Sequence, residues 1–279
     1  MPTNGGIIGP ENIPTTAVCN STMDFRTSGA GGHLDIANSG LNGGSLTGST
    51  TYTQEAWFYP TSLPTSGTGN QSGLWGSGVQ DLKCTSLEMH SGNNTYVYHR
   101  VSNAAGNDWL DYGHTGDASP SVNNWQHFAE VQHDGTNKLY MNGTHINTET
   151  TDSVGHGTYL SLPTGAEDGS GSNPRNAICL VSVWRVSSNA RYTANFVPPT
   201  EFIDDDYTLF LVVSDTTDGS TSFKDSSSNN ETVSLTGGPA DHSTDVASNI
   251  SVLKKASGMW SMNDVYEYKL DKRWPSIRA

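Results

Sequence analysis

The clearest alternation of apolar and polar residues lies between residues 125 and 146, which read WQHFAEVQHDGTNKLYMNGTHI. Side chains alternate between two faces from residue 128 to residue 133, as they do in a strand with one face toward a core. Asp134-Gly135 and Asn142-Gly143 interrupt the pattern. These pairs readily adopt the positive φ angles that tight hairpin turns require. The stretch therefore predicts three antiparallel strands in a meander.

Shorter runs of the same kind predict further strands along the chain, at 23–26, 32–36, 52–59, 87–90, 95–101, 108–112, 177–186 and 209–213. The run 177–186 is apolar almost throughout, which is typical of a strand buried on both faces. We interpret 61–80 as a Gly-rich loop and 147–176 as a polar stretch that ends in a loop at 165–176. No segment has the periodicity of a long amphipathic helix. The expected core residues are Trp57, Phe128, Val131, Tyr140, Ile178, Val181 and Val183.

Composition narrows the function classes. Charged residues make up 15% of the chain, against roughly 25% in average domains. The 28 acidic and 14 basic residues give a formal charge of −14, with no basic stripe, so we expect no nucleic-acid partner. No apolar run could span a membrane, and the first residues lack the pattern of a secretory signal. Cys19, Cys84 and Cys179 are odd in number and far apart, which predicts free buried thiols.

Three parts of the chain carry short sequence motifs, one after another along the chain. They are Met23-Asp24-Phe25 with Gly32 to Ile36, then Gln54 to Pro60, then Trp125-x-His127-x-Ala129-x-Val131 followed by Asp134-Gly135 and Leu139-Tyr140-x-Asn142-Gly143. This order resembles the signature of laminin-G-like, concanavalin A-like proteins over about residues 21–213. The resemblance implies an all-β, two-sheet antiparallel jelly roll with extended N- and C-terminal segments. It leaves function open, because this fold hosts lectins, hydrolases and adhesion modules alike.

A second resemblance concerns the segment 187–210. Its phrase Arg191-Tyr192-Thr193-x-Asn195-Phe196-x-Pro198-Pro199 is similar to the closing segment of laminin-G-like domains in bacteriophage structural proteins. Gly6 to Pro10 and Ser257 to Glu267 resemble paired terminal phrases of marine bacteriophage structural proteins. The resemblance implies a virion structural protein on the particle surface, as capsid decoration or a fibre component, that makes attachment or assembly contacts. Such a protein would be made in the host cytoplasm.

The domain organisation follows from these phrases. We expect an N-terminal arm at 1–20, a jelly roll at 21–245 and a C-terminal docking tail at 246–279. The phrase Phe223 to Asn230 opens many laminin-G-like domains but comes last here. A circular permutation is therefore expected, with strands in 207–236 completing the sheet that the first strands begin. Apolar residues at both ends are assembly candidates for contacts with other virion proteins or with copies of this chain: Ile7, Ile8, Trp260, Met262, Tyr266 and Trp274.

Recognition of host surface carbohydrate is the alternative function. The segment 103–119 combines aromatic rings with amide and carboxylate groups, which is the composition of a sugar site, and Trp75 offers a second ring. The candidate glycan-binding residues are Trp75, Asn107, Trp109, Asp111, Tyr112 and His114. The competing interpretation makes Trp109 and Tyr112 ordinary inward residues of a strand.

Catalysis ranks third. Glycoside hydrolysis needs two carboxyl groups roughly 5 to 9 Å apart, and glucanases of the resembled family carry them in a Glu-x-Asp-x-x-Glu phrase. The sequence lacks this phrase and lacks a zinc-protease histidine motif, so we expect no enzyme. His127 is interpreted as a core or edge residue. No cofactor is expected, although Asp108 with Asp111, or Asp204 to Asp206, could supply oxygen ligands to calcium.

Overall fold

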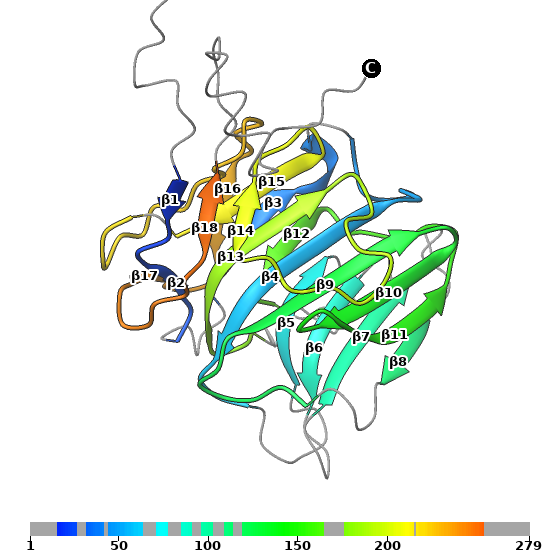
Figure 1. The fold of residues 1–279 in the computed structure, drawn as a ribbon, viewed down its shortest axis with the longest axis horizontal. Coiled ribbons are helices and arrows are strands. Elements are labelled where there is room, and N and C mark those ends of the chain that lie inside the picture. The colour runs from blue at the N-terminus through cyan, green and yellow to red at the C-terminus, as the bar shows by residue number, and fades with distance from the viewer. Residues whose placement is uncertain are drawn as a thin grey trace, which may run out of the picture.

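The computed structural model describes residues 16–26, 32–41, 44–63, 71–77, 85–90, 96–102, 109–113, 119–164, 176–214 and 216–253. They form two antiparallel sheets packed face to face, with a third, smaller sheet against one of them (Figure 1). The helical content of these residues is a single 3-10 turn, Asn38–Gly40. The all-β, two-sheet jelly roll expected from the sequence is confirmed. No helix among the described residues has the length and apolarity to cross a membrane.

The eight-stranded sheet carries most of the predicted strands. Its order is β11-β10-β9-β4-β13-β2-β17, and β15 also pairs with β13. The bounds are β2 Thr22–Asp24, β4 Tyr52–Pro60, β9 Gln126–His133, β10 Thr136–Met141, β11 Thr144–Thr150, β13 Cys179–Ser187, β15 Thr208–Val213 and β17 Asp241–Ser243. The meander β9-β10-β11 is the one that the 125–146 pattern predicts. Its turn residues Asp134, Gly135, Asn142 and Gly143 all have positive φ, between 48° and 75°.

The seven-stranded sheet has the order β16-β3-β12-β5-β6-β7-β8. Its strands are β3 His33–Ala37, β5 Gln71–Ser77, β6 Thr85–His90, β7 Tyr96–Ser102, β8 Trp109–Gly113, β12 Tyr159–Leu162 and β16 Val233–Thr236. Two of them lie where no strand was expected. β5 reads QSGLWGS and β12 reads YLSL. Pairing with neighbouring strands sets both, so the loop interpretation is wrong at 71–77, and β12 is an additional strand within the polar stretch 147–176.

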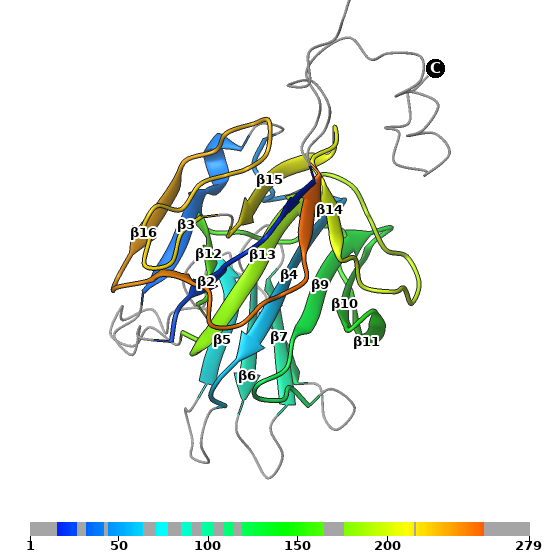
Figure 2. The same cartoon turned by 60° about the vertical axis from the view of Figure 1, so that its left-hand side comes forward.

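The main core lies between the two sheets, where large side chains such as Phe58, Trp75 and Phe128 are fully buried. A second cluster lies on the other side of the eight-stranded sheet, which we call its outer face. There Val183, Leu211 and Val213 form one cluster with residues of the small sheet. This sheet consists of β1 (Thr16–Val18), β18 (Ser251–Leu253) and β14 (Glu201–Ile203), which Figure 2 labels. This second layer explains why β13 is buried along its whole length.

The expected core is confirmed at five positions, listed here as Phe128, Val131, Tyr140, Val181 and Val183. Trp57 and Ile178 are only partly buried. Trp57 faces outward and packs against the second cluster, while its Nε1 donates a hydrogen bond of 2.9 Å to the Pro199 carbonyl. The strand pattern identified this residue as apolar, but its position next to an irregular segment could not be read from that pattern.

Both ends of the described chain meet in the small sheet. Thr16 pairs with Leu253, and Val18 pairs with Ser251. Late strands also join early ones, since β16 pairs with β3 and β17 pairs with β2. This is the pairing that a circular permutation requires, and the permutation itself stays a prediction. The six assembly candidates Ile7, Ile8, Trp260, Met262, Tyr266 and Trp274 lie outside the described residues.

Candidate functional site

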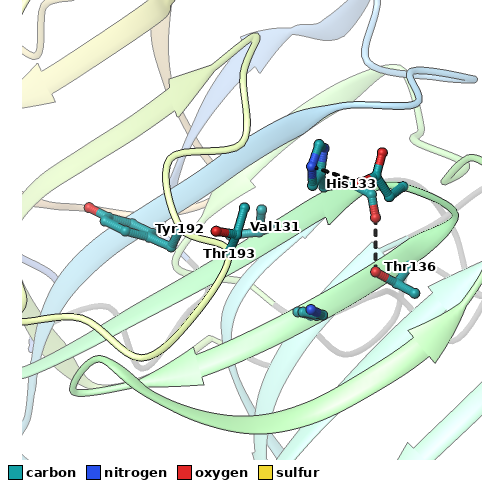
Figure 3. Close-up of a pocket in the computed structure, with 7 residues that line it drawn as sticks. Val131, His133, Thr136, Tyr192 and Thr193 are labelled. Carbon is teal, nitrogen blue, oxygen red and sulfur yellow. Dashed lines mark hydrogen bonds and ion pairs between the residues drawn. The ribbon is translucent and has the colours of Figure 1, made fainter.

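A half-open pocket of about 340 Å³ lies on the outer face, at the β9-β10 turn (Figure 3). The strands supply Val131, His133, Asp134, Thr136 and Lys138, and the irregular segment 188–200 supplies Tyr192 and Thr193. In the register of β9 and β10, Val131 pairs with Lys138 and His133 pairs with Thr136. Directly paired residues of antiparallel strands point to the same side, so the hairpin presents these side chains together.

The polar groups of the pocket differ in whether they already have hydrogen-bond or ion-pair partners. His133 Nε2 lies 3.1 Å from the Asp134 carboxylate, and Thr136 Oγ1 donates to the His133 carbonyl at 2.8 Å. The Lys138 ammonium has no ion-pair partner among the described residues. The pocket thus brings a cation, a carboxylate and hydroxyls together within one small volume.

We call residues 188–200 the strap, because they cross the outer face over β9 and β10. The Phe196 amide donates to the Gly143 carbonyl at 2.9 Å, and the His145 amide donates to Asn195 Oδ1 at 2.9 Å. Below the strap, its apolar side chains pack on Ala129, Val131 and Tyr140. The Tyr192 and Phe196 rings are stacked, with centroids 3.5 Å apart. The β9 face that points away from the main core is therefore covered and buried.

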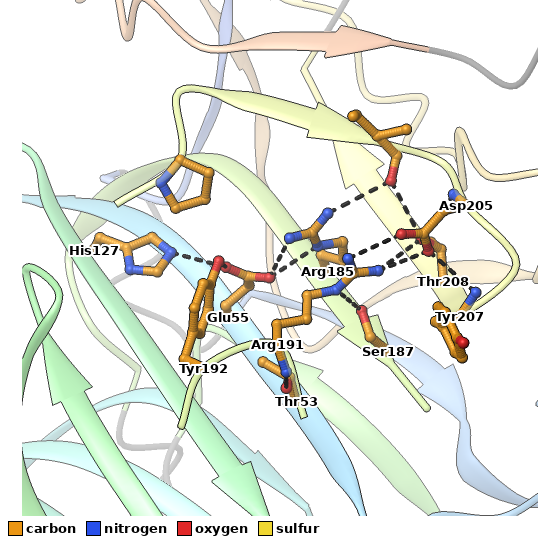
Figure 4. A network of polar contacts seen from close by, with 12 residues as sticks. Thr53, Glu55, His127, Arg185, Ser187, Arg191, Tyr192, Asp205, Tyr207 and Thr208 are labelled. Carbon is orange, nitrogen blue, oxygen red and sulfur yellow. Dashed lines mark hydrogen bonds and ion pairs between the residues drawn. The ribbon is translucent and has the colours of Figure 1, made fainter. Parts of the chain in front are cut away.

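A buried ionic network lies under the strap (Figure 4). The Glu55 carboxylate is fully buried and accepts hydrogen bonds from Arg185 at 2.6 and 2.8 Å. Its second oxygen lies 3.0 Å from His127 Nε2 and accepts the Tyr192 hydroxyl at 2.7 Å. Burial by itself would raise the pKa of Glu55. The positive charge of Arg185 and the hydrogen bonds outweigh burial and hold this pKa well below its ordinary range.

The same carboxylate has the opposite effect on Tyr192. Burial and the neighbouring negative charge of Glu55 raise the pKa of Tyr192 far above its ordinary value. The Tyr192 hydroxyl therefore stays protonated and remains a hydrogen-bond donor at neutral pH. The His127 ring contacts Glu55 through Nε2 and also meets the Trp57 ring edge-on. The expectation that His127 is a core residue is confirmed, since it is fully buried.

A second ion pair anchors the neighbouring strap residue. Arg191 donates to both oxygens of Asp205, at 2.8 and 3.0 Å, and to Ser187 Oγ at 2.6 Å. Partial burial would raise the pKa of Asp205, but the hydrogen bonds and charge of Arg191 outweigh it and lower this pKa. Asp204 to Asp206 were candidates for calcium, and Asp205 is committed to arginine instead. Among the described residues no cluster of three or more His, Cys, Asp or Glu could hold a metal ion.

The two fully buried glutamates of this sheet do not face one another. Glu55 pairs with Ala129, on the outer face, whereas Glu130 pairs with Gln54, on the inner face. Glu130 accepts hydrogen bonds from the Tyr52 hydroxyl, from Asn137 at 3.0 Å and from Trp75 Nε1 at 3.3 Å. Because the carboxylates lie on opposite sides of the sheet, they cannot act together on one bond.

The pocket contains none of the six glycan-binding candidates chosen from the sequence. Trp75 is fully buried in the main core, so the prediction that it forms an exposed platform is wrong. Trp109, Asp111 and Tyr112 lie on β8, the edge strand of the seven-stranded sheet. Asn107, His114 and the calcium candidate Asp108 lie outside the described residues. The sequence signal that could have found the pocket is the phrase Arg191-Tyr192-Thr193, but nothing local links it to the β9-β10 turn.

The chain belongs to the concanavalin A-like lectin/glucanases superfamily, whose laminin-G-type profile matches residues 28–191. No curated protein matches the chain in sequence. This assignment agrees with the two-sheet architecture and with the laminin-G-like signature read from the chain.

Solved structures are similar in fold. A protein of Bacteroides ovatus proposed to bind carbohydrate has a TM-score of 0.51 at 15% identity, over 83% of this chain and 60% of that one. A heptameric SAP-like pentraxin of Limulus polyphemus has a TM-score of 0.41 at 14% identity, over 62% and 77%. Tailspike protein 2 of bacteriophage CBA120 has a TM-score of 0.46 at 12% identity, over 77% and 35%. At these identities the similarity concerns the fold.

Proposed function

We propose that this protein is a lectin-like recognition module that binds carbohydrate in the pocket between the β9-β10 hairpin and the strap. The observation that carries the proposal is the pocket itself, half-open and about 340 Å³ in volume, on a sheet otherwise covered by packed side chains. Binding sites of proteins are concave and combine apolar surface with a few convergent polar groups. The Bacteroides ovatus protein, which is proposed to bind carbohydrate, supports this choice of ligand class only through its fold.

The chemistry of the pocket suits a sugar. Thr193 and Thr136 offer hydroxyls, Asp134 is an acceptor for ring hydroxyls, and Lys138 donates to an oxygen or to an acidic substituent. Val131 adds apolar surface at one wall. The Lys138 ammonium has no ion-pair partner among the described residues, so it can pair with a carboxylate or sulfate group of an acidic glycan.

We propose binding without catalysis. Among the residues that the structure describes, Asp134 is the one carboxylate that lines the pocket, and the buried Glu55 and Glu130 lie on opposite faces of the sheet. Hydrolysis with two cooperating carboxyl groups has no counterpart in this arrangement. Purified protein incubated with β-glucans and the glycans it binds should release no reducing sugar. Turnover that disappears on changing Glu88 or Glu130 would overturn this part.

Glycan-array binding tests the function. Wild-type protein should bind acidic glycans, and Lys138→Ala should weaken that binding by about tenfold through loss of a charge-assisted hydrogen bond. Thr193→Arg should block the pocket outright. Lys224→Ala is the matched control, because Lys224 is exposed and outside the pocket. No glycan binding by the wild type, or equal binding by Lys138→Ala, would refute the proposal.

We propose further that the module is displayed on the surface of a bacteriophage particle, as capsid decoration or a fibre component. The support is the resemblance of Arg191 to Pro199 to a phrase of bacteriophage structural proteins, and these residues make up most of the strap. Contacts with other virion proteins or with copies of itself belong to the same proposal. Electron microscopy of antibody-labelled particles should show label on the intact particle, and unlabelled particles would contradict it.

A further inference from the structure

The pocket of Figure 3 and the buried network of Figure 4 share one residue, Tyr192. Tyr192 is one of the residues that line the pocket, while its hydroxyl donates to Glu55 Oε2 at 2.7 Å. We infer that Glu55 is a positioning residue for the pocket: through the Tyr192 hydroxyl it holds the strap wall in the binding-competent arrangement. This inference rests on the proposed carbohydrate-binding function and assigns that site a buried support.

The first support is the completeness of the Glu55 contacts. Arg185 occupies one carboxylate oxygen, and His127 and Tyr192 occupy the other. A buried charge is stable only when its partners are in place. The Tyr192 hydroxyl is therefore drawn to one position, and displacing the strap would leave a buried carboxylate oxygen with one donor fewer.

The second support is the way the strap is fastened. Arg191, next to Tyr192, is bound by Asp205 and Ser187, and its amide donates to Thr53 Oγ1 at 2.9 Å. Phe196 and Pro199 carry the further bonds to Gly143 and Trp57. Between these anchors Thr193 is exposed and faces the pocket. The wall is thus fixed on both sides before any ligand arrives, which removes an ordering cost from binding.

The third support is the choice of residues. Apolar side chains could cover this part of β4 and β13, as they do under the small sheet, and replacing a buried ion pair by apolar groups often leaves a fold equally stable. Here, instead, the Tyr192 hydroxyl makes a directional hydrogen bond to Glu55 on the sheet, and Tyr192 also lines the pocket. Direction, rather than burial, is what a positioning role requires.

Tyr192→Phe provides the test, because it keeps the ring and its stack on Phe196 and removes only the hydroxyl. Amide hydrogen exchange should accelerate by about tenfold at Arg191 and Phe196, two strap amides with identified acceptors on either side of Thr193. Amides of β9 and β10 should keep their wild-type rates. Affinity for the array-selected acidic glycan should fall by about tenfold. Tyr159→Phe is the control, since Tyr159 is half exposed on the other sheet.

Each result decides the matter. Unchanged strap exchange in Tyr192→Phe would overturn the inference, and so would equal acceleration at all amides, which marks a merely structural role. Faster strap exchange with unchanged glycan affinity would overturn the positioning role as well. If the wild type binds no glycan but the strap amides of Tyr192→Phe still exchange faster, the result supports the role of Glu55 in holding the strap. It refutes the proposed carbohydrate-binding function. Glu55→Gln, if it folds, should reproduce the exchange pattern of Tyr192→Phe.

Discussion

Gly143 sets how closely the strap approaches the β10-β11 turn. Its φ is +75°, and a Cβ added there would lie 1.9 Å from the Phe196 carbonyl oxygen. Gly143→Ala should therefore lower the free energy of unfolding by roughly 3 kcal/mol, from backbone strain plus the clash. Gly219 has nearly the same φ, +73°, with nothing within 4 Å of its added Cβ. Gly219→Ala should cost only about 1 kcal/mol.

Urea unfolding of the two alanine variants separates the backbone contribution from the contact. Equal losses of stability in both would contradict the close approach of the strap carbonyl to residue 143.

His156 makes stability depend on pH at the residue scale. Its ring is fully buried, with Nδ1 at 3.1 Å from Ser77 Oγ, and burial lowers its pKa from 6.5 to about 4, against the opposing charge of Glu130. Between these values the unfolded chain binds a proton that the folded chain does not. The free energy of unfolding should therefore fall as pH drops from 6.5 to 4, by roughly 3 kcal/mol in all.

Urea unfolding at pH 7, 5.5 and 4 checks this sign and size. His156→Gln should show a shallower loss than the wild type over the same interval. Parallel curves for the two proteins would contradict the assignment of the proton to His156. The contribution of Glu55 enters at lower pH, because its pKa is depressed and its stabilisation is lost only as pH falls below the ordinary carboxyl value.

At the scale of elements, strands with a strong local pattern were predictable and those without one were not. β9 alternates and is closed by Asp-Gly, and β13 is apolar along most of its length, so both were found within a few residues of their bounds. β5 was missed because its glycines remove the pattern, and β12 was missed because it is short and its partners β3 and β5 are distant in sequence. Local preference could not indicate pairing that is decided by neighbours.

The site was hidden for a related reason. The pocket joins residues 131–138 to Tyr192 and Thr193 through an irregular segment with no periodicity. Sequence composition directed attention to the aromatic-rich stretch around Trp109 instead. The fully buried Glu55 has the same appearance in the sequence as any strand carboxylate, since its partner Arg185 lies on another strand. Only the register of β4 with β13 brings the two together.

The small sheet determines how an assembly experiment should be designed. β1 pairs with β18, and Cys19 is buried in the cluster beneath them. Deleting residues 1–15 or 254–279 should leave a folded domain that no longer joins the particle or forms an oligomer. Deleting residues 1–20 should also lower stability, because it removes β1 and Cys19. Chromatographic size and thermal unfolding measure the two effects, and unaltered assembly after both short deletions would contradict the docking role.

At the scale of the whole molecule, the fold separates two regions. The terminal segments leave from neighbouring positions in the small sheet, since Thr16 pairs with Leu253. The pocket lies instead at the β9-β10 turn, near the edge strand β11 of the eight-stranded sheet. A module attached through its ends would therefore keep its pocket on a different part of the surface. This division of the surface agrees with the proposed display on a particle.

Amide NMR of the labelled 29.8 kDa chain, titrated with the glycan selected by the array, tests the central proposal most directly. The account predicts that the largest chemical-shift changes fall on residues 131–138 and on Tyr192 and Thr193, saturate with one ligand per chain, and weaken in Lys138→Ala. Shift changes confined to β7 and β8, or to no region at all, would contradict it.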